Sequence, residues 1–253
     1  GARARTGRSG ARTRHAACRD AVRARPGAGH AGPCGQSRRR MGGADRCIDI
    51  AGNPILVGYT ASKILHLKQT QPDRYSLIDS ILLPHDYINL VLSGERSMEC
   101  GDASGTGLLD IRTRRWSQPM LDALDSDRDI AALLPAPRQG LGQIGTVTRD
   151  AAARFGLPQG IPVATGGGDN MMAAIGTGAT SPGRLTMSLG TSGTVFAYSD
   201  APVIDPRGEI AAFCSSTGGW MPLMCTMNCT VTTELLRGLF GTDIDYMESA
   251  IAS

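Results

Sequence analysis

Hydrophobic and polar positions recur at helical spacing in two stretches near the middle of the chain. Residues 60–75 (TASKILHLKQTQPDRY) predict a helix that Thr60 or Ser62 can cap and that ends before Pro72. A second helix is predicted at residues 85–93. The apolar positions on one side of this second helix are Tyr87, Ile88, Val91 and Leu92.

Residues 146–170 (TVTRDAAARFGLPQGIPVATGGGDN) continue with a helix and a strand. Thr148 caps a short alanine-rich helix, Gly156 closes it, and residues 161–165 form an apolar strand that runs into three glycines. Another helix is expected to start near Asp169. Helix, strand and helix in succession predict an α/β architecture.

After Gly183 the pattern changes to short apolar runs that are typical of strands. Four such runs follow one another, and the first two are joined by the turn GTSG. They cover residues 184–190, 194–200, 209–216 and 219–227. Residues 230–241 (TVTTELLRGLFG) then predict a helix. Its side chains expected to face inward are Leu235, Leu236, Leu239 and Phe240.

Charge separates residues 1–46 from the rest of the chain. The 253 residues carry a formal net charge of +3, but the first 46 hold 12 arginines and two aspartates, a net +10 that leaves −7 for the remainder. Val22 is the only large aliphatic residue before Met41. A segment of this composition cannot bury enough apolar surface to offset its chain entropy, so we expect it to be disordered.

Three interpretations of this segment are open. An arginine-rich arm could bind nucleic acid through its charge, but no aromatic residue precedes Tyr59 for base stacking. A transit peptide would be amphipathic, whereas this stretch has no apolar face. We favour the third interpretation, a stretch of GC-rich DNA read in a wrong frame, and leave residues 1–46 out of the fold.

Cysteines and histidines offer neither a metal site nor a hydrolase centre. The seven cysteines form no C-x-x-C pair. His66 and His85, the only histidines after residue 46, are assigned to helix surfaces, so GTSGT has no histidine partner for a serine nucleophile. No secretory signal and no apolar run near 18 residues is found. We therefore expect a cytoplasmic protein without a membrane partner.

Glycine-rich turns supply the candidate chemistry. Residues 140–145 (GLGQIG) satisfy the dinucleotide pattern G-x-G-x-x-G, but no strand is predicted before them and no helix opens there, so they are predicted to be a loop. The turn GTSG is either an ordinary hairpin turn or a concave site whose backbone N–H groups and two hydroxyls suit a phosphate. Its residues are Gly190, Thr191, Ser192 and Gly193.

Three consecutive glycines at residues 166–168 precede Asp169 and Asn170. Glycines let a ligand or another domain approach the backbone closely. Asp169 is expected at the start of a helix. There its carboxylate is either a simple N-cap or a general base that accepts a proton from a substrate hydroxyl at the mouth of an α/β cleft.

The sequence GGGDN followed by SLGTSG resembles the FGGY carbohydrate kinases. Earlier stretches are similar to the same family, and most of all to its xylulokinase branch; they are GYTASKILHL, LLPHDYINLVLSGE, GDASGTGLLDIRTRRWS and GLPQGIPVATGGGDN. The resemblance extends from Gly52 to about Gly241. His66 stands where the family usually has tryptophan.

This resemblance implies the actin-like ATPase fold (ribonuclease H-like), an α/β fold with two domains that close on a sugar and MgATP. It implies that Asp169 is the catalytic base, that Asn170 contacts the sugar and that residues 190–193 bind ATP phosphate. The expected activity is ATP-dependent phosphorylation of the terminal hydroxyl of a ketopentose, D-xylulose, with Mg2+ as the metal. The expected partners are this sugar and MgATP. A homodimer is left open, and nucleic acid is not expected.

Two family motifs, D-x-G-T for phosphate and M-H-G for sugar, are not found, and the adenine-binding segment would lie beyond residue 253. We therefore expect an interior fragment that is inactive alone. Residues 47–178 would be the last part of the first domain and residues 179–253 the start of the second. Two alternatives stay open: a kinase for another sugar of the family (ribulose, gluconate or glycerol), or a non-catalytic binding protein with the actin-like fold.

Overall fold

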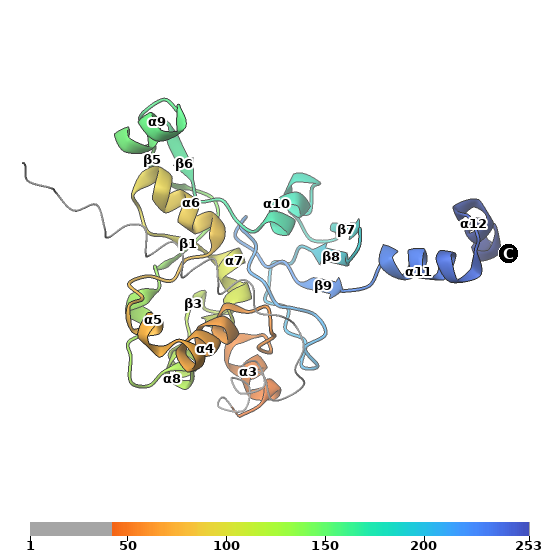
Figure 1. The fold of residues 1–253 in the computed structure, drawn as a ribbon, viewed down its shortest axis with the longest axis horizontal. Helices are drawn as coiled ribbons and strands as arrows, with labels where there is room; N and C mark the ends of the chain where they lie inside the picture. The colour runs from red at the N-terminus through yellow and green to blue at the C-terminus, as the bar shows by residue number, and fades with distance from the viewer. Residues whose placement is uncertain (1–41, 253) are drawn as a thin grey trace, which may run out of the picture.

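The computed structural model describes residues 42–252, with side chains up to Ala250 (Figure 1). Most of the predicted arginine-rich segment lies outside the described residues. Helix α3 (Ala44–Ala51) begins three residues before the predicted boundary at residue 47 and buries Cys47. The division into two domains at residue 178 stays a prediction.

The main hydrophobic core lies in the first part of the described chain. Helices α3, α4 (Thr60–Thr70) and α8 (Gln118–Leu124) surround the antiparallel pair β2 (Leu109–Asp110) and β3 (Arg115–Trp116) (Figure 1). Short 3-10 turns at Ser104–Thr106 and Ala131–Leu133 complete this part. Its fully buried side chains include Ile55, Leu65, Leu108, Leu109 and Met120.

The start of α4 differs from the prediction. Tyr59 occupies the N-cap position, and neither Thr60 nor Ser62 caps the helix. Ser62 Oγ instead donates to the Leu56 carbonyl at 3.0 Å, because it lies one turn inside the helix and faces the incoming chain. The helix ends before Pro72, as predicted, and Pro72 begins α5 (Pro72–Ser76), since proline fits the first helical turn.

Helix α6 (Pro84–Ser93) buries polar residues, whereas the apolar side that its pattern predicts is covered only in part, through Leu92. Gly94 closes the helix in the left-handed region, with φ of 79°, as expected. Tyr87 and Ile88 are 39% and 55% exposed. Its buried residues are Asp86, Asn89 and Ser93. The Asn89 amide donates to the Thr165 carbonyl at 2.8 Å, so this polar side holds the end of a neighbouring strand.

Strands β5 (Gln143–Thr146) and β6 (Pro162–Ala164) pair antiparallel beside α6. Helix α9 (Arg149–Phe155) connects them, and its predicted caps are confirmed: Thr148 Oγ1 accepts the Ala151 N–H, and Gly156 closes the helix at φ of 67°. The second half of GLGQIG belongs to β5, so only its first half is the predicted loop. Strand β6 then leads directly into the three glycines.

A three-stranded antiparallel sheet follows, formed in order by β7 (Leu185–Leu189), β8 (Gly193–Ala197) and β9 (Leu223–Thr226). Helix α10 (Asp169–Gly176) packs against β7. Residues 209–216, predicted as a strand, form only isolated bridges. Ala211 and Phe213 hydrogen-bond the backbone of Leu223 and Met221, whereas the Asn53 side chain hydrogen-bonds both the N–H and the carbonyl of Ala212 between them, at 2.7 and 2.6 Å.

Helices α11 (Thr230–Phe240) and α12 (Ile244–Ala252) extend away from the rest of the chain (Figure 1). The expectation that α11 turns its apolar side inward is wrong for the described residues, since none of its residues is buried. An apolar stripe predicts that a helix packs against something, but it does not say which segment provides that surface. The exposed fractions are 70% for Leu235, 40% for Leu236, 75% for Leu239 and 71% for Phe240.

Candidate active site

The three glycines allow the chain after β6 to pass close to side chains of other segments. Gly166 has φ of 74°, which disfavours any side chain. A Cβ on Gly167 would lie 2.8 Å from Ser216 Oγ, and a Cβ on Gly168 would lie 3.3 Å from Asp102 Oδ1. The glycines therefore bring the backbone close to segments that are distant in the sequence, which gives a physical reason for this run.

Asp169 is the first residue of α10, and Gly168 rather than Asp169 occupies its N-cap position. Within residues 42–252, the Asp169 carboxylate accepts hydrogen bonds only from its neighbour, at 2.7 Å from the Asn170 N–H and 3.3 Å from the Asn170 amide. Both residues are exposed. The carboxylate is thus accessible, as a general base must be, whereas it does not make the hydrogen bond of an N-cap.

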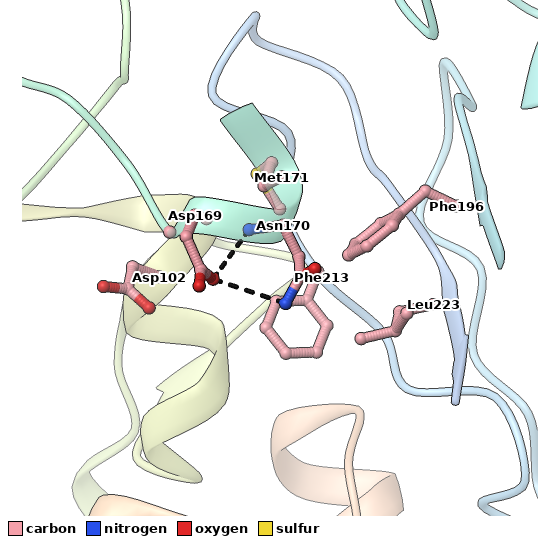
Figure 2. Close-up of a pocket in the computed structure, with 9 residues that line it drawn as sticks. Asp102, Asp169, Asn170, Met171, Phe196, Phe213 and Leu223 are labelled. Carbon is pink, nitrogen blue, oxygen red and sulfur yellow. Dashed lines mark hydrogen bonds between the residues drawn. The ribbon is translucent and has the colours of Figure 1, made fainter. Parts of the chain in front are cut away.

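Asp169 and Asn170 line a pocket of about 160 Å³ between α10, α7 (Cys100–Ala103) and the three-stranded sheet. Figure 2 shows Asp102 and Asp169 towards one side of this pocket, Phe196 and Leu223 towards the other, and Asn170 and Phe213 between them. A pocket with convergent polar groups and an apolar wall is typical of a site for a small organic ligand.

Asp102 is held by a histidine that the sequence assigned to a helix surface. His85 is the second residue of α6, and its Nδ1 lies 2.8 Å from Asp102 Oδ2, while its Nε2 lies 2.9 Å from Asp86 Oδ1. The assignment to the surface is wrong, because the His85 side chain is only 22% exposed and lies between two carboxylates. Helical spacing within α6 alone could not show that α7 packs here.

Charge around His85 favours its protonated form. Burial lowers the pKa of His85, but the hydrogen bond to Asp102, the 2.9 Å contact with the Asp86 carboxylate and the negative charges of both outweigh burial and raise the pKa to about 10. His85 is therefore an imidazolium at neutral pH. It lies between a fully buried carboxylate, Asp86, and one at the edge of the pocket, Asp102.

Glu99 holds the N-terminus of α7 in position. It ends β1 (Met98–Glu99), which pairs parallel with β4 (Pro137–Arg138). Its fully buried carboxylate accepts the N–H groups of Gly101 and Asp102, both at 2.8 Å, and so caps α7. Burial raises the pKa of Glu99. The backbone of Asp102 is therefore held by Glu99, and its side chain by His85.

The GTSG turn lies outside this pocket. It joins β7 to β8, and its carbonyls bind the start of α11: the Cys229 N–H donates to Thr191 and the Thr230 N–H donates to Gly190, both at 3.0 Å. Thr191 and Ser192 are exposed. The structure therefore brings Asp169 and Asn170 together in one pocket, whereas residues 190–193 form a separate loop on the same sheet that supplies Phe196 to the pocket wall.

Residues 33–176 match the N-terminal domain of the FGGY family of carbohydrate kinases. The chain belongs to the FGGY family. This FGGY-family chain is 41% identical over 206 residues to the xylulose kinase of Haemophilus influenzae, covering 81% of the chain and 42% of that protein. It is 36% identical over 194 residues to the xylulose kinase of Escherichia coli, covering 75% of the chain and 39% of that protein. The chain thus spans less than half the length of these curated relatives.

Solved structures confirm the predicted fold. A structure described as a xyloylose kinase from Brucella ovis superposes with a TM-score of 0.74 at 29% identity, covering 85% of this FGGY-family chain and 44% of that chain. The xylulose kinase of Rhodospirillum rubrum superposes with a TM-score of 0.77 at 22% identity, covering 86% of this FGGY-family chain and 44% of that chain. The FGGY-family chain therefore has the actin-like ATPase fold of sugar kinases, over part of that fold.

Two further observations concern absences within residues 42–252. No helix in this range is long and apolar enough to cross a membrane. The same range also contains no group of three or more histidine, cysteine, aspartate or glutamate side chains arranged to hold a metal ion.

Sequence reasoning missed several residues of the pocket. Asp102 lies within GDASGTG, a stretch that resembles the family, but nothing in its local pattern indicates that it approaches Asp169. Phe196 and Phe213 were assigned to strands with no role in the site. A search for acidic residues near glycines could have singled out Asp102, since glycines precede both carboxylates at this pocket.

Proposed function

We propose that this chain is part of an ATP-dependent kinase that phosphorylates the terminal hydroxyl of a ketopentose, D-xylulose. The accessible carboxylate of Asp169, next to the glycine turn and at the mouth of a pocket, is the observation that carries this proposal. The names of the similar relatives support xylulose as the sugar. The resulting product is D-xylulose 5-phosphate.

In this proposal Asp169 accepts the proton of the terminal hydroxyl as the hydroxyl oxygen attacks the γ-phosphorus, and the bond from the γ-phosphorus to the bridging oxygen breaks to release ADP. The hydrogen bond from the Asn170 N–H holds one carboxylate oxygen, Oδ1, and leaves the other free to face the hydroxyl. A positioned base of this kind contributes about 10²–10⁴-fold to the rate. The Asn170 amide, at the same edge of the pocket, is placed to bind a neighbouring sugar hydroxyl.

The GTSG loop fits the phosphates of ATP. Thr191 and Ser192 present two exposed hydroxyls, and the first turn of α11, an eleven-residue helix, is hydrogen-bonded to the same loop. The partial positive charge of a helix N-terminus favours an anion there. ATP, bound with Mg2+, supplies the transferred phosphoryl group and charge stabilisation. Closure of the two domains would have to bring this loop to the pocket.

A chimera tests the proposal. Residues 42–252 replace the matching segment of the Haemophilus influenzae xylulose kinase, and phosphorylation is followed by ADP release with D-xylulose, D-ribulose, gluconate and glycerol. We expect D-xylulose to be the preferred sugar and Asp169→Asn to lower kcat by at least ~10²-fold. The 253-residue chain alone is expected to be inactive.

The controls separate folding from chemistry. Asp169→Asn should leave urea unfolding unchanged, because the side chain is exposed and bonds only to its neighbour. A chimera that unfolds cooperatively but does not phosphorylate D-xylulose would contradict the proposed activity. Normal turnover by Asp169→Asn would contradict the role of the base.

A further inference from the structure

We propose that Asp102 is a second carboxylate of the sugar site, which accepts hydrogen bonds from sugar hydroxyls, and that His85 is the positioning residue that holds it. This inference rests on the proposed function and adds two residues to it. The ligand of this site is an open-chain sugar with hydroxyls on adjacent carbons.

Geometry places Asp102 in the same pocket as Asp169 but on a different element. Asp169 comes from α10 and Asp102 from α7, and both line the pocket (Figure 2). The residue before Asp169 lies close to Asp102, since a Cβ added at Gly168 would lie 3.3 Å from Asp102 Oδ1. Two carboxylates from two different helices therefore line one small cavity.

The two oxygens of Asp102 have different surroundings. Oδ2 lies 2.8 Å from His85 Nδ1 and is engaged by it. Oδ1 makes no hydrogen bond with any residue of the described part of the chain, although the side chain is only 29% exposed. A carboxylate oxygen has room for two hydrogen bonds, so Oδ1 is an acceptor available to a ligand in the pocket.

Charge explains why a histidine stands beside Asp102. Four carboxylates lie in this region: Asp86 on α6, Glu99 on β1, Asp102 on α7 and Asp169 on α10. The His85 imidazolium is the positive charge that contacts two of them directly. With Asp86 fully buried behind it, the imidazole ring is held in place and directs its Nδ1–H at Asp102.

The chemistry of a polyol matches this arrangement. A single base at Asp169 can take one proton, but it cannot fix which hydroxyl of a chain of hydroxyls lies next to it. A second acceptor at Asp102 binds a hydroxyl further along the sugar, and hydrogen bonds to a charged group are the stronger kind. The apolar wall of Phe196, Phe213 and Leu223 can face the C–H side of the sugar.

The chimera described above provides the test, with Asp102→Asn as the main variant. We expect the KM for D-xylulose to rise about tenfold or more while the KM for ATP changes little, since a lost hydrogen bond to a charged group weakens binding by about this factor. Asp73→Asn is the matched control, because Asp73 is an exposed carboxylate of α5, outside the pocket, whose side chain makes no hydrogen bond or ion pair with a described residue. It should change neither KM.

His85 is tested by substitution and rescue. His85→Gln should raise the KM for D-xylulose as Asp102→Asn does, and His85→Lys should restore it in part, because lysine again places a cation beside Asp102. If His85 had only a structural role, both substitutions would lower stability, and the KM for D-xylulose would not differ between His85→Gln and His85→Lys. Equal KM values for His85→Gln and the unsubstituted chimera would overturn the positioning role.

The outcomes separate this inference from the proposed function. If the chimera phosphorylates D-xylulose and a cooperatively folded Asp102→Asn behaves like Asp73→Asn, only the role of Asp102 is overturned. If Asp102→Asn does not fold, Asp102→Glu, which keeps the charge and moves the carboxylate, must raise the KM instead. If the chimera is inactive, the proposed function fails, and direct NMR titration of the 253-residue chain decides: D-xylulose binding lost in Asp102→Asn supports the site, and equal or absent binding overturns it.

Discussion

Replacing Gly167 by alanine tests how tightly the glycine turn is packed. The added Cβ would lie 2.7 Å from Met172 Cε and 2.8 Å from Ser216 Oγ, both shorter than real side chains allow. The Met172 methyl can move at little cost because it ends a flexible side chain. Ser216 cannot, since it is 3% exposed and its hydroxyl donates to Met171 Sδ at 3.3 Å.

This overlap predicts a loss of stability. Forcing one extra carbon into a packed interior costs about 1–3 kcal/mol, so we expect the free energy of unfolding of Gly167→Ala to fall by that amount in urea titrations. The turn also carries Asp169, and a shift of about 1 Å in a reacting group can lower the rate by about 10²-fold. The kcat of the chimera should therefore fall as well.

Gly176→Ala is the matched control, at the other end of α10. An added Cβ there meets no atom within 4 Å. Alanine is the better helix former, so we expect unchanged or slightly higher stability, by less than about 1 kcal/mol. Equal unfolding free energies for Gly167→Ala and Gly176→Ala would refute the explanation given for the glycine run.

Two other predictions concern single hydrogen-bonded groups. Thr148→Ala removes the side-chain cap of α9 and should lower the free energy of unfolding by about 1 kcal/mol in urea titrations, whereas no change would show that the cap contributes nothing. His85 has a pKa raised from 6.5 to about 10, so the stability it contributes is complete below pH 6.5 and is lost as the pH rises through 10. The free energy of unfolding in urea should therefore fall more between pH 7 and 10 for the unsubstituted chain than for His85→Gln. Parallel pH profiles of the two would contradict this.

Local signals predicted much of the secondary structure. The α9 helix, with Thr148 and Gly156 at its ends, was read correctly because a cap depends on residues within one turn. The hairpin formed by β7 and β8 was also read correctly, because alternating apolar runs joined by a glycine turn are sufficient to specify it. Residues 209–216 were predicted as a strand but form only isolated bridges, and the Asn53 side chain, far away in the sequence, hydrogen-bonds Ala212 within them.

The candidate site likewise combines residues that the local sequence pattern indicated with residues that it did not. The run of glycines, Asp169 and Asn170 are adjacent in the sequence, so their pattern alone indicated a site, and its resemblance to a kinase family indicated the chemistry. His85 and Asp102 lie 17 residues apart, on different helices, and their ion pair could not be read from either stretch. The packing of α6 against the β5–β6 pair, and of α7 beneath the glycine turn, decides that they meet.

The sequence by itself indicated the family, several helices and the β7–β8 hairpin, and the candidate carboxylate that follows the glycines, because each of these depends on residues that are close in the chain. Only the tertiary structure decided which side of α6 is buried and which second carboxylate shares the pocket. Burial and charge pairing depend on contacts between different segments, and these contacts cannot be predicted from hydrophobic periodicity. The polar side of α6 is buried for that reason: its partners are the carboxylate of Asp102 and the carbonyl of Thr165.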